Sequence, residues 1–116
     1  HRQVAKASRR FASLDDPARH QLRKRVKRLR YALEFAQALY GPKRVARYLR
    51  ALTALQERLG ALNDVGVALA AFRGARADDA PAVFALGWLV ARREALAGDC
   101  LPAIERFARA KRPWKD

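Results

Sequence analysis

The segment from Asp16 to Tyr40 combines dense positive charge with a helical apolar pattern. Six of the eight residues from 23 to 30 are Lys or Arg. Apolar residues nevertheless recur along it at intervals of three and four, a spacing that predicts one apolar face on a helix. The expected core face consists of Leu22, Val26, Leu29, Leu33, Ala36 and Tyr40. A chain built on this segment must therefore be helical, with most of its charge directed away from the core.

Helical spacing continues through the rest of the chain, and no strand pattern interrupts it. The predicted helices cover approximately residues 2–13, 17–40, 42–59, 64–73 and 81 onward. Short connections between helices favour antiparallel neighbours. At 116 residues, the chain is long enough for one core. The sequence thus predicts an all-α, antiparallel four-helix-type bundle that forms a single domain over residues 1–116.

The predicted helix boundaries depend on Asp, Asn, Pro and Gly residues. Asp15 or Asp16 is expected to cap the basic helix, with Pro17 in its first turn. Gly41-Pro42 separates that helix from the next one. Gly60 is expected to end the third helix by a chain reversal, after which Asn63 or Asp64 caps a short helix.

The last helix is expected to start at Asp79 and Pro81. Pro102 should kink that helix or split it near Gly98-Asp99, because proline cannot donate a helical hydrogen bond. Phe84, Trp88 and Phe107 are spaced as core residues of this helix. The expected core face of the third helix is Val45, Leu49, Leu52, Leu55 or Gln56, and Leu59.

Positive charge dominates the chain, with a net charge of +14 and an isoelectric point of about 11.3. Residues 1–60 hold 16 Lys and Arg against 4 Asp and Glu, whereas residues 61–116 hold 9 against 7. Such a field attracts polyanions, and the split predicts that the first half of the chain meets them. The second half is expected to act mainly as scaffold.

The compartment and the chain ends are inferred from a few residues. One cysteine, Cys100, cannot form an internal disulfide, so the chain fits a reducing, cytoplasmic environment. Its longest apolar run, about residues 84–91, is too short to span a bilayer. The chain begins at His1 and contains no methionine, so we expect a fragment or a processed product, with His1 as a candidate tag remnant.

On a helical wheel, part of the charge of the basic helix forms a row beside the apolar face. The row contains His20, Arg23, Lys27, Arg30 and Tyr31, and Glu34 continues it. A solvated face explains most charge runs, about two in three by general experience of such patterns. Here, however, like charges one turn apart repel one another, which favours an external anion. Arg and Lys are suited to phosphate, and a row at one-turn spacing suits a linear polyanion. Lys24, next to the row, and Arg47, on the following helix, are candidates to extend this surface.

The sequence contains no pattern typical of an enzymatic or metal site. His20 lacks converging histidine, cysteine or carboxylate partners for a metal ion. The two acidic pairs, at residues 15–16 and 78–79, are explained by helix capping. Cys100 has no histidine partner and is expected to be a small core residue. We therefore expect a protein without catalytic residues, cofactor or metal.

Two other polyanion-binding functions remain open at this point. A nucleic-acid-binding helical bundle fits the charge equally well, although the row lacks interleaved aromatic residues for base stacking. A basic amphipathic helix could also lie on a membrane, but the apolar face of this helix is committed to the bundle. A membrane partner is therefore not expected.

Two motifs at a defined separation resemble the CHAD family, the conserved-histidine α-helical domain. The first, HxxRKxxKRLRYALE, is matched by His20, Arg23, Lys27, Arg30, Tyr31 and Glu34. The second, LxxLQExLGxLND, is matched by Leu55, Gln56, Leu59, Gly60, Asn63 and Asp64. The resemblance is strong over residues 17–73 and weak over the last helix.

The resemblance implies a domain of two related four-helix halves, with a basic channel between them that binds inorganic polyphosphate. Tyr31 and the following ALEF sequence resemble the second repeat, so this chain is similar to one half of such a domain. It implies a phosphate-binding role for His20, Arg23, Lys27 and Arg30, and a lesser one for Tyr31. The implied partners are a first-half repeat or a second copy of this chain, and a CYTH-type triphosphatase domain in the parent protein. Polyphosphate granules are an implied location.

Overall fold

The structure is a computed structural model, which describes residues 1–39, 41–72 and 78–114. Its four α-helices are α1 (Arg2–Arg9), α2 (Asp16–Ala36), α3 (Pro42–Ala71) and α4 (Ala80–Ala108). Short 3-10 turns, Phe11–Ser13 and Gln37–Leu39, follow α1 and α2. No strand occurs in the described residues, so the predicted all-α class is confirmed. The first predicted helix is shorter than expected, and α2 gives way to a 3-10 turn before Tyr40, which lies outside the described residues.

Side-chain caps start α2 and α4 where the sequence predicted them. The Asp15 carboxylate accepts a hydrogen bond from the backbone N–H of Ala18 at 2.8 Å. Asp79 accepts one from the N–H of Ala82 at 3.2 Å. Each bond satisfies a backbone donor that the first helical turn leaves without an intrahelical partner. These two boundaries are therefore fixed by local chemistry.

The predicted break at Gly60 is wrong, because α3 continues through it from Pro42 to Ala71. Asn63 and Asp64 consequently lie inside a helix and cap nothing. Leu59 and Leu62, on either side of the glycine, are both buried in the core. A glycine inside a helix costs about 1 kcal/mol, whereas burial of one leucine contributes about 1.5–3 kcal/mol. The continuous apolar face therefore outweighs the local breaking signal.

Of the two outcomes expected at Pro102, a kink or a split near Gly98-Asp99, the split does not occur. Helix α4 runs unbroken from Ala80 to Ala108 with Pro102 inside it. Proline in a helix interior costs about 3 kcal/mol. The residues around it, Cys100, Ala103, Ile104 and Phe107, are all buried. Their packing against the rest of the bundle compensates for the missing hydrogen bond.

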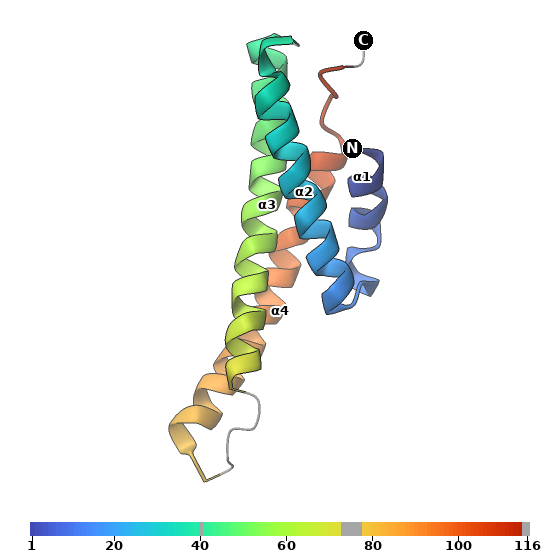
Figure 1. The fold of residues 1–116 in the computed structure, drawn as a ribbon. Helices are drawn as coiled ribbons and strands as arrows, with labels where there is room; N and C mark the ends of the chain where they lie inside the picture. The colour runs from blue at the N-terminus through green and yellow to red at the C-terminus, as the bar shows by residue number, and fades with distance from the viewer. Residues whose placement is uncertain (40, 73–77, 115–116) are drawn as a thin grey trace.

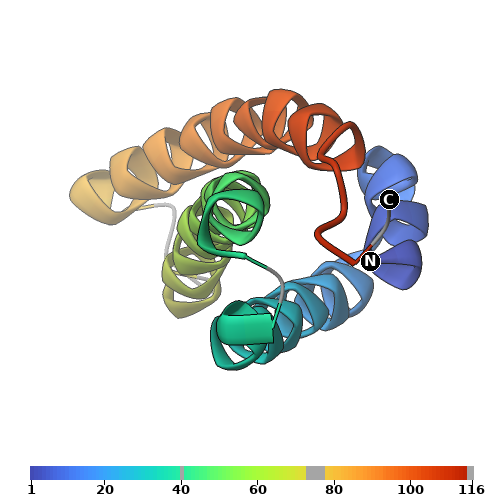
Figure 2. The ribbon, with the colours of Figure 1, turned by 90° about the horizontal axis from the view of Figure 1, so that it is seen from above.

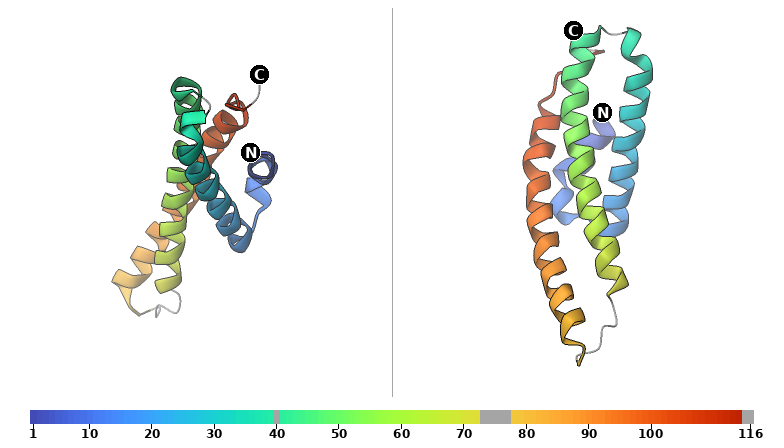
Figure 3. Two further views of the ribbon diagram at one scale, coloured as in Figure 1. Left: turned by 45° about the horizontal axis from the view of Figure 1, so that its top comes forward. Right: turned by 90° about the vertical axis from the view of Figure 1, so that its left-hand side faces the viewer.

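The helices pack as an elongated bundle of about 60 × 23 × 19 Å. Helix α3 lies antiparallel to both α2 and α4, and the short helix α1 closes one side against α2 and α4 (Figures 1 and 3). Of the predicted core face of α2, Leu22, Val26 and Leu33 are buried, while Leu29 and Ala36 are half-buried. The wheel therefore identified the buried side of the basic helix correctly.

An aromatic cluster at one end of the core was not foreseen. Tyr48, rather than the half-buried Leu49, is fully buried on α3, and it packs against Phe107 with ring centres 5.5 Å apart. His1 lies 4.8 Å from Phe107, and Trp114 lies 5.5 Å from Tyr48. His1 is thus a packed residue, which the interpretation as a tag remnant did not anticipate.

The other two aromatic residues expected in the core of the last helix are at the surface. Phe84 is 76% exposed and Trp88 is 59% exposed, whereas Phe107 is buried as expected. Both exposed residues lie in the first turns of α4, which extend past the start of α2 (Figure 1). Fewer helices are available there to cover the apolar face. On α3, Leu55 is fully buried and Gln56 only half-buried, which settles that alternative in favour of leucine.

Candidate functional site

The basic row follows one side of α2 beside its buried face. His20 and Lys27 are exposed, and Arg23 and Arg30 are half-buried. Long basic side chains commonly lay their aliphatic stems on apolar surface while their charged ends reach water. Because one α-helical residue advances 1.5 Å, the row from His20 to Arg30 extends over about 15 Å. It is a linear cationic surface, longer than one phosphate group.

Tyr31 organises the far end of this row. The side-chain nitrogen of Lys27 lies 5.8 Å from the centre of the Tyr31 ring, and the guanidinium carbon of Arg30 lies 5.2 Å from it. These are cation–π distances. The Nε atom of Arg30 lies 3.7 Å from Oε1 of Glu34, an ion pair too long for a hydrogen bond. The tyrosine ring therefore holds two cations together, and one acid partly neutralises the second of them.

The head of the row opens onto a cavity of about 320 Å³ between α2, α3 and α4. We call it the His20 cavity. Among the side chains that the structure describes, its ionisable lining consists of four basic residues and includes no Asp or Glu. The lining residues are Arg19, His20, Arg23, Leu59, Leu62, Asn63, Gly66, Val67, Ala70 and Arg93. The structure thus joins the first two residues of the row to groups from two other helices.

Two arginines of the His20 cavity were missed by the sequence analysis. Arg19 lies with its guanidinium carbon 4.5 Å from the centre of the Phe11 ring, so the segment after α1 helps to position it. Its Nε atom is buried and makes no hydrogen bond within the described part of the chain. Arg93 reaches the cavity from α4. Only the tertiary fold brings it there, and the local charge pattern offers no signal for it.

The remaining candidates lie apart from the His20 cavity. Lys24 is exposed on α2 and lines neither this cavity nor the larger one described below. Lys27, Arg30 and Tyr31 do not line the His20 cavity either, although they continue the row beyond it. Arg47 lies on α3 in the larger cavity, which no residue of the row lines. Arg47 therefore belongs to a second basic surface.

The expected division into a binding first half and a scaffolding second half needs correction. Arg93 lines the His20 cavity, and Arg109, Lys111 and Arg112 line the larger cavity together with residues of α1 and α3. The second half of the chain has little net charge because its 7 acids nearly balance its 9 bases. Net charge summed along the sequence does not reveal which cations the fold brings together.

Cys100 and the acidic residues offer no obvious chemistry in the described residues. Burial raises the pKa of the Cys100 thiol to about 11, an effect that Arg19 only partly opposes. A buried thiol with a raised pKa is a poor nucleophile at neutral pH. No group of three or more His, Cys, Asp or Glu residues in the described ranges has the geometry of a metal site. None of the helices described has the length and apolarity that crossing a membrane would require.

Comparison with known proteins gives one match. No curated protein and no solved structure matches the chain significantly. The family model for the CHAD domain matches residues 1–73. This match covers more than half of the chain and includes α1, α2 and α3, with the whole basic row and Asn63 of the His20 cavity. The chain therefore belongs to the CHAD-domain family.

Proposed function

We propose that this protein is a non-catalytic module that binds inorganic polyphosphate along the basic row of α2. The observation that carries the proposal is the continuity of the row with the His20 cavity. His20 and Arg23 line a cavity whose ionisable groups are all basic, and Lys27 and Arg30 extend the same face. Membership of the CHAD-domain family supports polyphosphate as the anion.

The chemistry of the row favours phosphate groups over nucleic-acid bases. Arginine binds phosphate oxygens through a planar fork, and lysine binds them as a mobile point charge. The only aromatic residue of the row, Tyr31, has two cations, Lys27 and Arg30, over its ring. A base would have to displace them before it could stack. The ring is therefore better placed to hold cations for a phosphate chain than to read single-stranded nucleic acid.

We extend the proposal to the partners of this chain. Phe84 and Trp88 leave apolar surface on the first turns of α4, which a first-half CHAD repeat or a second copy of the chain would cover. A CYTH-type triphosphatase domain in the parent protein remains part of the proposal, as does a cytoplasmic location that includes polyphosphate granules. That this chain is not an enzyme is part of the same proposal; Cys100 itself is buried with a raised thiol pKa, which makes it a poor nucleophile.

A competition experiment tests the proposed ligand. Long-chain polyphosphate and single-stranded DNA of matched total charge compete for the labelled protein at fixed salt. We expect polyphosphate to displace DNA at much lower concentrations than those at which DNA displaces polyphosphate. If DNA is bound equally well or better, the alternative of a nucleic-acid-binding helical bundle replaces the proposal.

A pair of double variants tests the proposed site. Lys27→Gln with Arg30→Gln should weaken binding of long-chain polyphosphate at least about tenfold, because charged hydrogen bonds are lost. The control is Arg50→Gln with Arg58→Gln, which removes the same charge from exposed positions of α3 that line neither cavity. Equal losses in the two variants would mean that binding is diffuse and that the row is no site.

A further inference from the structure

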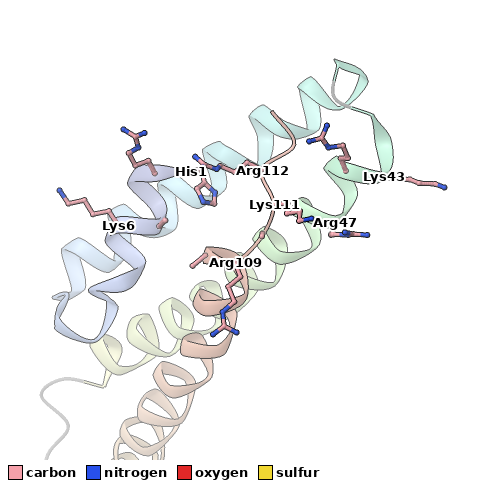
Figure 4. Close-up of a pocket in the computed structure, with 12 residues that line it drawn as sticks. His1, Lys6, Lys43, Arg47, Arg109, Lys111 and Arg112 are labelled. Carbon is pink, nitrogen blue, oxygen red and sulfur yellow. The ribbon is translucent and has the colours of Figure 1, made fainter. Parts of the chain in front are cut away.

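A second basic surface lies at the end of the bundle opposite the α3–α4 connection, in a cavity of about 1070 Å³. We call it the terminal cavity. Three segments far apart in the sequence contribute cations to it: α1, the start of α3, and the residues at and after the end of α4 (Figure 4). Its basic lining consists of Arg2, Lys6, Lys43, Arg44, Arg47, Arg109, Lys111 and Arg112, together with His1. Within residues 1–39, 41–72 and 78–114, no Asp or Glu lines the cavity.

The terminal cavity is separate from the site proposed above. It shares no lining residue with the His20 cavity and includes no member of the basic row. In Figure 4, Lys6 extends from α1 on one side of the segment after α4, while Lys43 and Arg47 extend from α3 on the other. The cavity is therefore lined by α1, the start of α3 and the segment at the end of α4, whereas the basic row lies on α2.

Aromatic packing fixes the segment that forms one wall of this cavity. After α4, the chain turns back toward α1 and α2 (Figure 2). Pro113 is buried, and the ring of Trp114 packs 5.5 Å from that of Tyr48. A 2.7 Å hydrogen bond joins the Tyr48 hydroxyl to Nδ1 of His1, which is itself part of the lining. Lys111 and Arg112 are therefore held near α1 and α3 by buried contacts.

The charge and size of the terminal cavity define the class of its ligand. Like charges confined to one cavity repel one another, and among the described residues the lining of this cavity contains many bases and no Asp or Glu. A bound anion would relieve this repulsion, and Arg and Lys supply suitable donors to phosphate oxygens. The cavity has room for more than one phosphate group, and its several cations favour an anion that carries several charges.

We propose that the terminal cavity binds a compact condensed phosphate of a few phosphoryl groups, independently of the basic row. Cations from three segments would surround such a ligand, whereas the row presents cations in one line. The proposal stands apart from the proposed function, because a long chain on the row and a short one in the cavity use different residues. Free oligophosphate and the end of a longer chain share the recognised chemistry.

Tripolyphosphate is the probe for this proposal, with binding measured by calorimetry over a series of salt concentrations. The test variant combines Arg47→Gln and Arg109→Gln, both in the lining. The control combines Arg50→Gln and Arg106→Gln, which lie three residues from Arg47 and Arg109 in the sequence, are exposed and line neither cavity. The two variants have equal net charge, so a difference between them reports on the cavity.

We expect the Arg47/Arg109 variant to bind tripolyphosphate at least about tenfold more weakly than the control. Its affinity should also depend less steeply on salt, by a log–log slope smaller by roughly two, one for each lost contact. Circular dichroism of each variant verifies the helical fold. Equal affinity for tripolyphosphate in the two variants would overturn the proposal.

The Lys27→Gln/Arg30→Gln variant separates this proposal from the proposed function. It should bind tripolyphosphate as the wild type does while losing affinity for long-chain polyphosphate. If the Lys27/Arg30 variant loses affinity for tripolyphosphate and the Arg47/Arg109 variant does not, the short ligand binds the row and the terminal cavity is no site. If the Lys27/Arg30 variant keeps its affinity for both ligands, the proposed function fails. The proposal for the terminal cavity is then still tested by the Arg47/Arg109 variant and its control.

Discussion

The guanidinium carbon of Arg30 lies 5.2 Å from the centre of the Tyr31 ring, so an exposed aromatic side chain supports a cation of the basic row. We predict that Tyr31→Leu weakens binding of long-chain polyphosphate about two- to fivefold, since an exposed cation–π contact contributes about 0.5–1 kcal/mol. Tyr31→Phe should retain most of the affinity because it keeps the ring. Titration of the wild type and the two variants with labelled polyphosphate measures these affinities. If Tyr31→Phe loses more affinity than Tyr31→Leu, the effect belongs to the hydroxyl group and not to the ring.

Glu34 would compete for Arg30 with a phosphate bound at the proposed site. Its Oε1 atom lies 3.7 Å from Nε of Arg30, and ion pairs at this helical spacing contribute about 0.3–0.5 kcal/mol. We predict that Glu34→Gln binds long-chain polyphosphate about twofold more tightly, because a competing charge is removed while the side-chain shape is kept. Glu57→Gln, at an exposed position of α3 outside both cavities, is the matched control. Equal gains in the two variants would indicate a general effect of net charge.

Cys100 links the stability of the core to alkaline pH. Burial raises its thiol pKa from 9.0 to about 11 in the folded protein. The folded state therefore holds this proton more tightly, and the contribution to stability is complete below the unfolded pKa and lost as pH rises through the folded pKa. We predict that the wild type loses more unfolding free energy than Cys100→Ala between about pH 8 and about pH 10. Urea unfolding of both proteins at the two pH values measures the unfolding free energies. Equal losses in the wild type and Cys100→Ala would show that the thiol does not contribute.

Gly60 and Gly41 should respond oppositely to alanine. Gly60 lies inside α3, and an added Cβ would meet no atom within 4 Å. Gly60→Ala should therefore stabilise the protein by about 0.5–1 kcal/mol. Gly41 has a φ of 73°, which is unfavourable for other residues, so Gly41→Ala should destabilise it by about 1–2 kcal/mol. Urea denaturation of both variants tests the pair, and destabilisation by Gly60→Ala would contradict the continuous helix.

The sequence predicted those features that depend on neighbouring residues. The Asp15 and Asp79 caps and the buried side of α2 follow from spacing and capping chemistry over one or two turns. Gly60 and Pro102 misled the analysis because each is a local breaking signal that tertiary burial overrides. Propensity predicts where a helix is weak, but packing decides whether it ends.

In the candidate site, too, only the part that lies on one helix was predictable from the sequence. The row of α2 lies on one helix, and its wheel placed Lys27 and Arg30 on one face, as the structure does. Arg93, on α4, lines the His20 cavity together with residues of α2 and α3, and Arg109, just after α4, lines the terminal cavity together with residues of α1 and α3 that are distant in sequence. Neither charge counts nor helical spacing can reveal such a convergence, because it depends on how the helices pack.

The first turns of α4 extend past the start of α2, where fewer helices support them than at mid-bundle (Figure 3). Because local opening is easiest where few buried contacts resist it, amide hydrogens near Phe84 should exchange with solvent faster than those near Ile104. We therefore expect a gradient of local stability along the bundle. The end near the α3–α4 connection carries the exposed Phe84 and Trp88, whereas the terminal cavity lies toward the opposite end, so fraying of the first end should leave the cations of the terminal cavity in place.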